Sequence, residues 1–255
     1  MSNLPKLNEN ISYINIKLPS GKTIGVRGWK VKDERELLFA LDAEESPDEQ
    51  KNAHINNFLR KCTNNTTIFD QLSEVDLRKI ALEIRKLSKG DTIQYSYRCP
   101  CQVLANPEIS GSTDVKTCNN VIEDEIQLSK SEVVKFFDPK PSVINDRLVV
   151  VFKDISYTTG LKLAEKYINS PSQYIFYYMI NSIEAFTFDN VSYTEFSEDE
   201  LVEFIDGLAS EDMEKIQAEF ESKASALHLQ RKLKCRKCGN EFDVQFGDLY
   251  SFLIL

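Results

Sequence analysis

Five of the six cysteines lie in two short windows of the 255-residue chain. The first window holds Cys99, Cys101 and Cys118, and the second holds Cys235 and Cys238. Cysteine thiolates are preferred ligands of zinc in closed structural sites, where four of them surround the ion as a tetrahedron. The grouping therefore predicts a structural zinc site assembled from two distant parts of the chain.

The second window has the more specific pattern. Cys235 and Cys238 belong to a Cys-x-x-Cys-Gly sequence that segments of strand character enter and leave. This pattern is typical of a zinc-ribbon knuckle, a tight turn that directs two thiolates and several backbone N–H groups at one point. Gly239 supplies the special backbone conformation that such a turn needs.

The first window resembles the second with an insertion. Cys118 and the two asparagines after it parallel Cys238 with its Gly-Asn, and residues 102–117 form the insertion. Because the insertion is rich in Pro, Gly, Ser, Thr and Asn, it is predicted to be a surface loop. Cys101 competes for one ligand place in the first knuckle, and Cys62 is expected in the core. The expected zinc ligands are Cys99, Cys118, Cys235 and Cys238.

Other uses of these thiols stay open. A redox Cys-x-x-Cys usually stands at the N-terminus of a helix, which lowers the thiol pKa, whereas strand-like alternation follows Cys238. The start of the chain lacks the pattern of a secretory signal, so the protein is expected in the cytoplasm, where disulfides are disfavoured. The cysteines could also be buried thiols that hold no metal.

The second knuckle is crowded by basic residues, which admit two interpretations. They could contact nucleic acid, or they could offset the net charge of about −2 on a zinc ion with four thiolates. The chain has 40 acidic and 31 basic residues and a formal charge of −9, a poor balance for binding nucleic acid or an anionic membrane. This balance favours the electrostatic role. The basic residues are Arg231, Lys232, Lys234, Arg236 and Lys237.

The sequence has no pattern typical of a catalytic site. Its only histidines, His54 and His228, do not form a His-Glu-x-x-His motif, and neither a phosphate-binding glycine motif nor a Gly-x-Ser-x-Gly elbow occurs. A metal held by four cysteines has no open position for a substrate. The apolar runs are shorter than the roughly 20 residues that span a bilayer. We therefore expect a non-enzymatic protein without a membrane segment or a small-molecule substrate.

The knuckles must be held by the elements around them. Alternating segments over residues 92–98 and 121–128 enter and leave the first knuckle, and residues 227–233 enter the second. The clearest helix runs from Ser73, a candidate N-cap, to Leu87, with apolar residues at intervals of three and four. Similar patterns predict an N-terminal hairpin over 11–29, a strand over 148–152, a hairpin over 186–193, and helices over 33–41, 50–62, 158–169 and 172–185 and from Ser197 and Ser210.

Together these patterns predict an α+β fold with a mostly helical body, short β-hairpins and a zinc-ribbon-like module of two cysteine knuckles. Three regions follow from this interpretation. Residues 1–90 hold the N-terminal β-hairpin and helices, and residues 129–226 form an α-helical region with a short strand and a hairpin. Residues 91–128 join residues 227–255 in the zinc-ribbon-like module.

The linear order of several motifs carries a resemblance over nearly the whole chain. The motifs are Leu18-Pro-Ser-Gly-Lys-Thr-Ile24, residues 31–38, Phe69-Asp70, the helix of residues 77–90 with its following strand, Cys235-x-x-Cys238-Gly239 and the aromatic tail of residues 248–252. In this order the chain resembles the baseplate hub assembly proteins of T-even-type contractile-tailed bacteriophages. It departs from them at Cys99-Pro-Cys101 and the long insertion, which leaves the choice of ligands in the first knuckle open.

The resemblance implies a protein that helps build the central hub of the tail baseplate in the cytoplasm of the infected cell. It implies binding surfaces for phage hub or tape-measure proteins, either as a structural component that stays in the virion tail baseplate or as an assembly chaperone. The main alternative is a zinc-ribbon adaptor that binds nucleic acid, for example in transcription. A thiol oxidoreductase is a third interpretation.

Overall fold

The computed structural model describes residues 12–41, 48–105, 114–246 and 253. Its helices are α1 (Val31–Leu41), α2 (Asp48–Lys61), α3 (Glu74–Lys89), α4 (Leu128–Ser131), α5 (Tyr157–Lys166), α6 (Pro171–Asn181), α7 (Glu198–Asp206) and α8 (Ser210–Lys223), with a 3-10 turn at Phe69–Gln71. Its strands are β1 (Ile14–Lys17), β2 (Thr23–Val26), β3 (Thr92–Arg98), β4 (Gln102–Leu104), β5 (Val115–Thr117), β6 (Val121–Gln127), β7 (Glu132–Lys135), β8 (Ser142–Val143), β9 (Leu148–Phe152), β10 (Ile183–Phe188), β11 (Val191–Tyr193), β12 (Ala226–Lys234) and β13 (Glu241–Phe246).

The prediction of a mostly helical body is wrong. The structure is about 40% helical and 29% strand, and its strands form several antiparallel sheets. The short strands β7 and β8 were missed because two to four residues are too few to show a periodic pattern. Their pairing depends on distant partners, since β7 pairs with β12 and β8 with β9.

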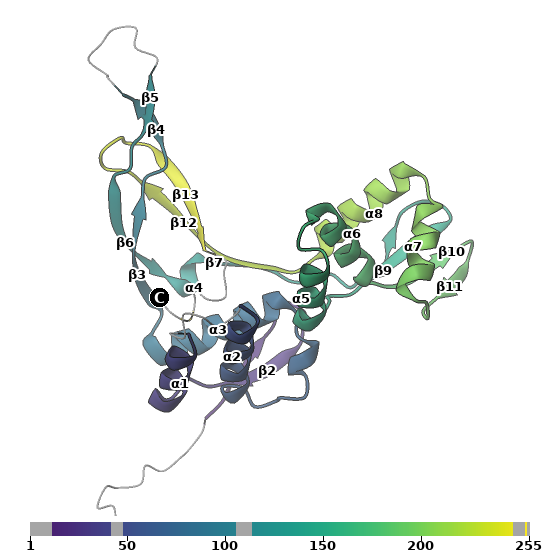
Figure 1. The fold of residues 1–255 in the computed structure, drawn as a ribbon, viewed down its shortest axis with the longest axis horizontal. Coiled ribbons are helices and arrows are strands. Elements are labelled where there is room, and N and C mark those ends of the chain that lie inside the picture. Colours follow the sequence, from purple (N-terminus) through teal and green to yellow (C-terminus); the bar gives the residue numbers. More distant parts are fainter. Residues whose placement is uncertain (1–11, 42–47, 106–113, 247–252, 254–255) are drawn as a thin grey trace, which may run out of the picture.

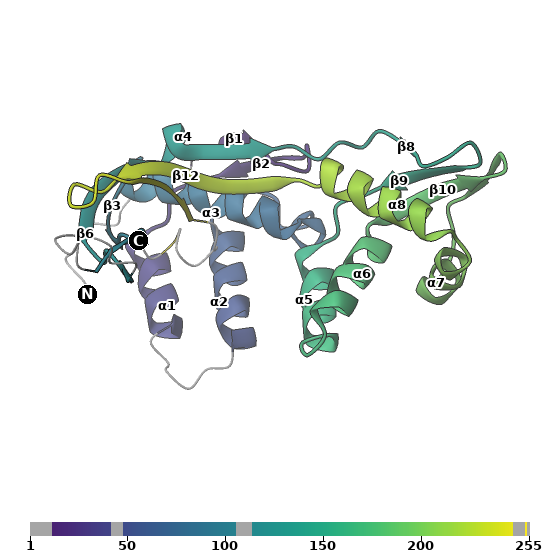
Figure 2. The ribbon, with the colours of Figure 1, turned by 90° about the horizontal axis from the view of Figure 1, so that it is seen from above.

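The elements gather in three parts (Figure 1). Helices α1–α3 and the β1–β2 hairpin form the first part. The second is an arm made of two antiparallel ribbons, β3–β6 and β12–β13, with the β4–β5 hairpin near its end. The third holds α5–α8 around the sheet with strand order β11-β10-β9-β8. Strand β12 runs from the third part into the arm (Figure 2), and the three-region division of the sequence stays a prediction.

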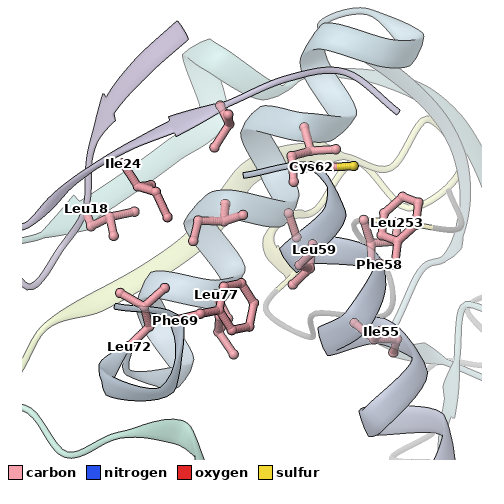
Figure 3. Close-up of a cluster of buried hydrophobic side chains, with 14 of the residues drawn as sticks. Leu18, Ile24, Ile55, Phe58, Leu59, Cys62, Phe69, Leu72, Leu77 and Leu253 are labelled. Carbon is pink, nitrogen blue, oxygen red and sulfur yellow. The ribbon is translucent and has the colours of Figure 1, made fainter. Parts of the chain in front are cut away.

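The first part has its own apolar core, shown in Figure 3. Side chains from the hairpin, α2 and α3 meet there, and Leu18, Leu59 and Leu77 are at most 1% exposed. Cys62 lies in this core and is fully buried, as predicted, with burial raising the pKa of its thiol to about 11. Leu253 packs into the same cluster, so a residue near the C-terminus contributes to the N-terminal core.

Helix α3 begins as its sequence predicts. The Ser73 hydroxyl accepts a hydrogen bond from the Asp76 backbone N–H at 3.2 Å, and the Asp76 carboxylate accepts from the Ser73 N–H at 3.4 Å, which forms a capping box. Asp76 is fully buried and also accepts the Ser20 N–H at 3.0 Å. One carboxylate thus joins the start of α3 to the turn of the β1–β2 hairpin.

Helix α3 also supports the base of the arm. A small apolar cluster joins its far side to the arm strands, and Leu82, Ile126 and Leu229 are buried in it. Beside this cluster, Lys79 and Lys86 of α3 both contact Glu132 of β7. These contacts connect the base of the arm to α3.

The third part has a second apolar core in which α6, α7 and α8 cover the β9–β10 strands. The helix predicted from Ser197 is confirmed as α7, and Ser197 forms a capping box with Glu200. Helix α6 ends at Asn181, earlier than predicted, because β10 begins at Ile183 and pairs with β9. The apolar residues after position 181 therefore belong to a strand.

Candidate metal centre

Two ribbons end side by side at the cysteines. In the β3–β6 ribbon, Arg98 pairs with Val121, and in the β12–β13 ribbon, Lys234 pairs with Glu241. Cys99 and Cys235 each follow directly after the last paired residue of a strand. The rings of Tyr97 and Phe242 stack between the ribbons with centroids 5.8 Å apart. The ribbons therefore bring their two turns together at one end.

The two turns share the same backbone hydrogen bonds. The Cys99 N–H donates to the Asn120 carbonyl at 2.9 Å, and the Cys235 N–H donates to the Asn240 carbonyl at 2.9 Å. Each bond closes a turn around its pair of cysteines. The first turn is therefore built like the second, although 18 residues separate its two cysteines.

The position after the second cysteine of each turn has left-handed backbone geometry. Asn119 has φ 51° and Gly239 has φ 75°. The Asn119 N–H donates to the Cys99 carbonyl at 3.1 Å, and the Gly239 N–H donates to the Cys235 carbonyl at 2.8 Å. Glycine and asparagine adopt this conformation most readily. The parallel between the two windows is visible in the sequence, whereas the backbone role of Asn119 is seen only in the structure.

The insertion in the first turn is not a simple surface loop. Strands β4 and β5 pair from Gln102↔Thr117 to Leu104↔Val115, and residues 106–113 lie outside the described part. The Cys118 N–H donates to the Cys101 carbonyl at 2.8 Å, so the pairing continues to the base of the hairpin. The hairpin returns the chain to its starting point, which places Cys118 beside Cys99.

The four sulfur atoms of Cys99, Cys118, Cys235 and Cys238 all lie within 4.8 Å of one another. The Sγ atoms of Cys99 and Cys238 are 3.7 Å apart, and those of Cys118 and Cys235 are 3.8 Å apart. A tetrahedron with zinc–sulfur bonds of about 2.3 Å has edges of about 3.8 Å. A disulfide would need about 2.0 Å, and all four cysteines are free. The four cysteines could therefore hold a metal ion.

The remaining candidate ligands stand apart from this group. Cys101 is half-buried and packs against the cluster, but its sulfur is not among the four that converge. His228 is half-buried in β12, and Cys62 lies in the N-terminal core. Among the described residues, the only group of three or more metal-binding side chains is the four-cysteine cluster.

The thiols of Cys235 and Cys99 differ in acidity. Hydrogen bonding from the Cys238 backbone N–H lowers the pKa of Cys235 to about 6. Desolvation raises the pKa of Cys99 to about 11. The Asn120 side-chain amide also contacts the Cys235 sulfur at 3.6 Å. The Cys235 thiol therefore loses its proton more readily than the Cys99 thiol, and thiols that bind a metal do so as thiolates.

Three of the five basic residues around the second knuckle are paired with acidic ones. Arg231 contacts Asp124 at 3.2 Å across the two ribbons, and Lys232 and Lys234 lie 3.6 and 4.0 Å from Glu241. These pairs reduce the positive field that a nucleic-acid phosphate backbone would need. The arrangement weakens the nucleic-acid interpretation.

Comparisons with known proteins add one positive finding. A family model described as "T4 bacteriophage base plate protein" matches residues 11–254. No curated protein and no solved structure matches the chain. In the described ranges, no helix combines the length and the apolar character needed to cross a membrane.

Proposed function

Because the chain belongs to the T4 bacteriophage base plate protein family, we propose that it helps to assemble the central hub of the tail baseplate by binding hub or tape-measure proteins. The observation that carries this proposal is the extent of the family match, which runs from residue 11 to residue 254. The family suggests a structural rather than a catalytic protein. The linked parts and projecting arm suit a protein that offers several surfaces to neighbours.

Zinc is the metal that best suits the cysteine cluster. Four converging thiols match its preference for sulfur and for tetrahedral geometry, and the site leaves no position for a substrate. Cys99, Cys118 and Cys235 are buried, and Cys238 is half-buried, so the site is largely shielded from water. Zinc would supply a bond between the two ribbons, and we assign the cluster a structural role.

We expect about one zinc ion per chain in protein purified under reducing conditions, because the cluster offers one set of four ligands. Cys118→Ser should lose most of the metal, whereas Cys101→Ser should keep it. Elemental analysis of the folded proteins measures both values. Metal loss in Cys101→Ser with retention in Cys118→Ser would contradict the proposed ligand set.

The hub role can be tested in phage that lack this gene. Infected cells should accumulate tail parts without completed baseplates, and the wild-type gene supplied on a plasmid should restore them. Electron microscopy of the lysates, together with plaque counts, measures the result. Normal baseplates and normal plaque counts in the mutant would refute the role in assembly.

The place of the protein in the finished particle needs a separate measurement. We expect it in purified tails, as for a structural component of the virion. Quantitative mass spectrometry of purified virions and of assembly intermediates distinguishes the two roles. Presence in intermediates and absence from virions would instead identify an assembly chaperone.

A further inference from the structure

The negative charge of the chain is concentrated in residues 129–226, which include the third part. Residues 129–226 contain 18 acidic and nine basic residues, which accounts for the whole formal charge of −9, and the rest of the chain has 22 of each. Residues 198–223, which span α7 and α8, contain ten acidic and two basic residues. Lys223, one of these two, is buried beside Asp138. Helices α7 and α8 thus form a strongly negative region.

An apolar cleft of about 600 Å³ opens in this region between α6 and α8. Ile175 lines it and is 56% exposed, so an apolar side chain stands at its edge without cover. Two of the three methionines of the chain line it as well, and methionine and tyrosine are frequent at adaptable binding surfaces. The apolar lining is formed by Tyr174, Ile175, Phe176, Tyr178, Met179, Met213 and Phe220.

The edges of the cleft are acidic. Glu221 and Gln217 of α8 line it, and Glu214 shares their helix face through its spacing of three and seven residues. Glu74, at the start of α3, also lines the cleft and pairs with Arg78. The residues described as lining the cleft include neither lysine nor arginine. An apolar floor between acidic edges fits a segment with one apolar face and basic flanks.

We propose that the α6–α8 cleft binds a basic amphipathic helix of another baseplate or tail protein. Such a helix would place its apolar face on Ile175 and Met213 and its lysines or arginines near Glu214 and Glu221. The proposal rests on the proposed function only for the source of the partner.

A second copy of this chain suits the cleft less well than another protein. Outside residues 129–226 the acidic and basic residues are equal in number. The basic residues of β12, Arg231, Lys232 and Lys234, are already paired with carboxylates. Nothing in this balance supplies a surplus of positive charge to match α7 and α8, so the complementary segment belongs to a different protein.

Peptide binding to the purified full chain tests the recognition. The probe is a fluorescent 14-residue helix of leucines and lysines with leucines at intervals of three and four, and fluorescence anisotropy measures its dissociation constant. Ile175→Glu should weaken binding about tenfold, because it places a charge in the apolar contact. Ile168→Glu is the matched control, since Ile168 is 76% exposed outside the cleft, and it should bind like the wild type.

A second pair of variants tests whether binding requires the negative charge of the cleft. Gln217→Lys, at the cleft, should weaken the basic peptide severalfold and make its binding less sensitive to salt, whereas Gln230→Lys, exposed on β12, should change little. A peptide with glutamates in place of lysines should not bind. Equal binding of both peptides, or equal effects of Ile175→Glu and Ile168→Glu, would overturn the proposal.

The natural partner is tested in assembled tails with a photoreactive benzophenone side chain at the position of Gln217. Cross-linking to a basic amphipathic segment of another tail protein, mapped by mass spectrometry, is the expected result. Cross-links to a second copy or to an acidic segment would overturn the proposal. If the protein is absent from tails and from their assembly intermediates, the proposed function fails, while the peptide measurement still decides the cleft.

Discussion

Cys235→Ser should abolish metal binding and destabilise the arm by about 4 kcal/mol or more, because structural zinc contributes its binding energy directly to folding. Cys235 is fully buried, and its sulfur is 3.8 Å from that of Cys118. The site joins cysteines that are far apart in the sequence, since Cys118 and Cys235 are separated by 117 positions and Cys99 and Cys238 by 139. Without the metal, the ribbons must bring these segments together at an entropic cost. Thermal unfolding should show a melting temperature lower by about 10 °C.

Hydrogen exchange locates this effect. Amide protection should fall in β3, β6, β12 and β13 and remain in α2 and α3, since the N-terminal core is separate. Cys101→Ser is the matched control and should leave protection unchanged. Cys62 is a poor control, because it is fully buried in the N-terminal core and its substitution would disturb packing. Equal small losses for Cys235→Ser and Cys101→Ser would argue against a structural metal.

Asp76→Ala should destabilise the N-terminal part by about 2–4 kcal/mol, because it removes a helix cap and leaves buried backbone N–H groups without an acceptor. Those donors are the N–H groups of Ser20, 3.0 Å from one carboxylate oxygen, and of Ser73, 3.4 Å from the other. Chemical denaturation followed by circular dichroism measures the free energy of unfolding.

The same substitution at an exposed aspartate provides the comparison. The side chain of Asp70 is 69% exposed and pairs with Arg60, and such surface pairs contribute about 0–1 kcal/mol. Asp76→Asn, which keeps one acceptor oxygen, should fall between the two alanine variants. A loss for Asp76→Ala no larger than that for Asp70→Ala would refute the structural role of the buried carboxylate.

Local sequence patterns predict the helices, strands and turns whose geometry depends only on residues close together in the chain. Helix α3 was predicted correctly because its cap at Ser73 and its apolar face are encoded within a few turns. Strand β3 was predicted for the same reason, since alternation over seven residues needs no distant information. The Cys-x-x-Cys-Gly turn likewise carries its geometry in its own residues, with Gly239 at positive φ.

The sequence does not show which distant strands pair with each other. The pairing of β7 with β12 joins Glu132 to Leu229, and the sequence of neither strand indicates the other as its partner. The composition of the β4–β5 segment is that of turns and predicts a loop, whereas its pairing depends on three residues on each side. The error in helical content follows from these missed strands.

The sequence by itself determined the cysteine windows, the helix caps and the concentration of acidic residues, because each depends on residue type and short spacing. Only the tertiary structure decided that Cys118 and not Cys101 faces Cys235, because the hairpin between them must close before the sulfurs can converge. It also decided that α6 and α8 enclose an apolar cleft. Both results arise from contacts between segments that are far apart along the chain. Such contacts produce no periodic pattern within either segment, so the sequence does not predict them.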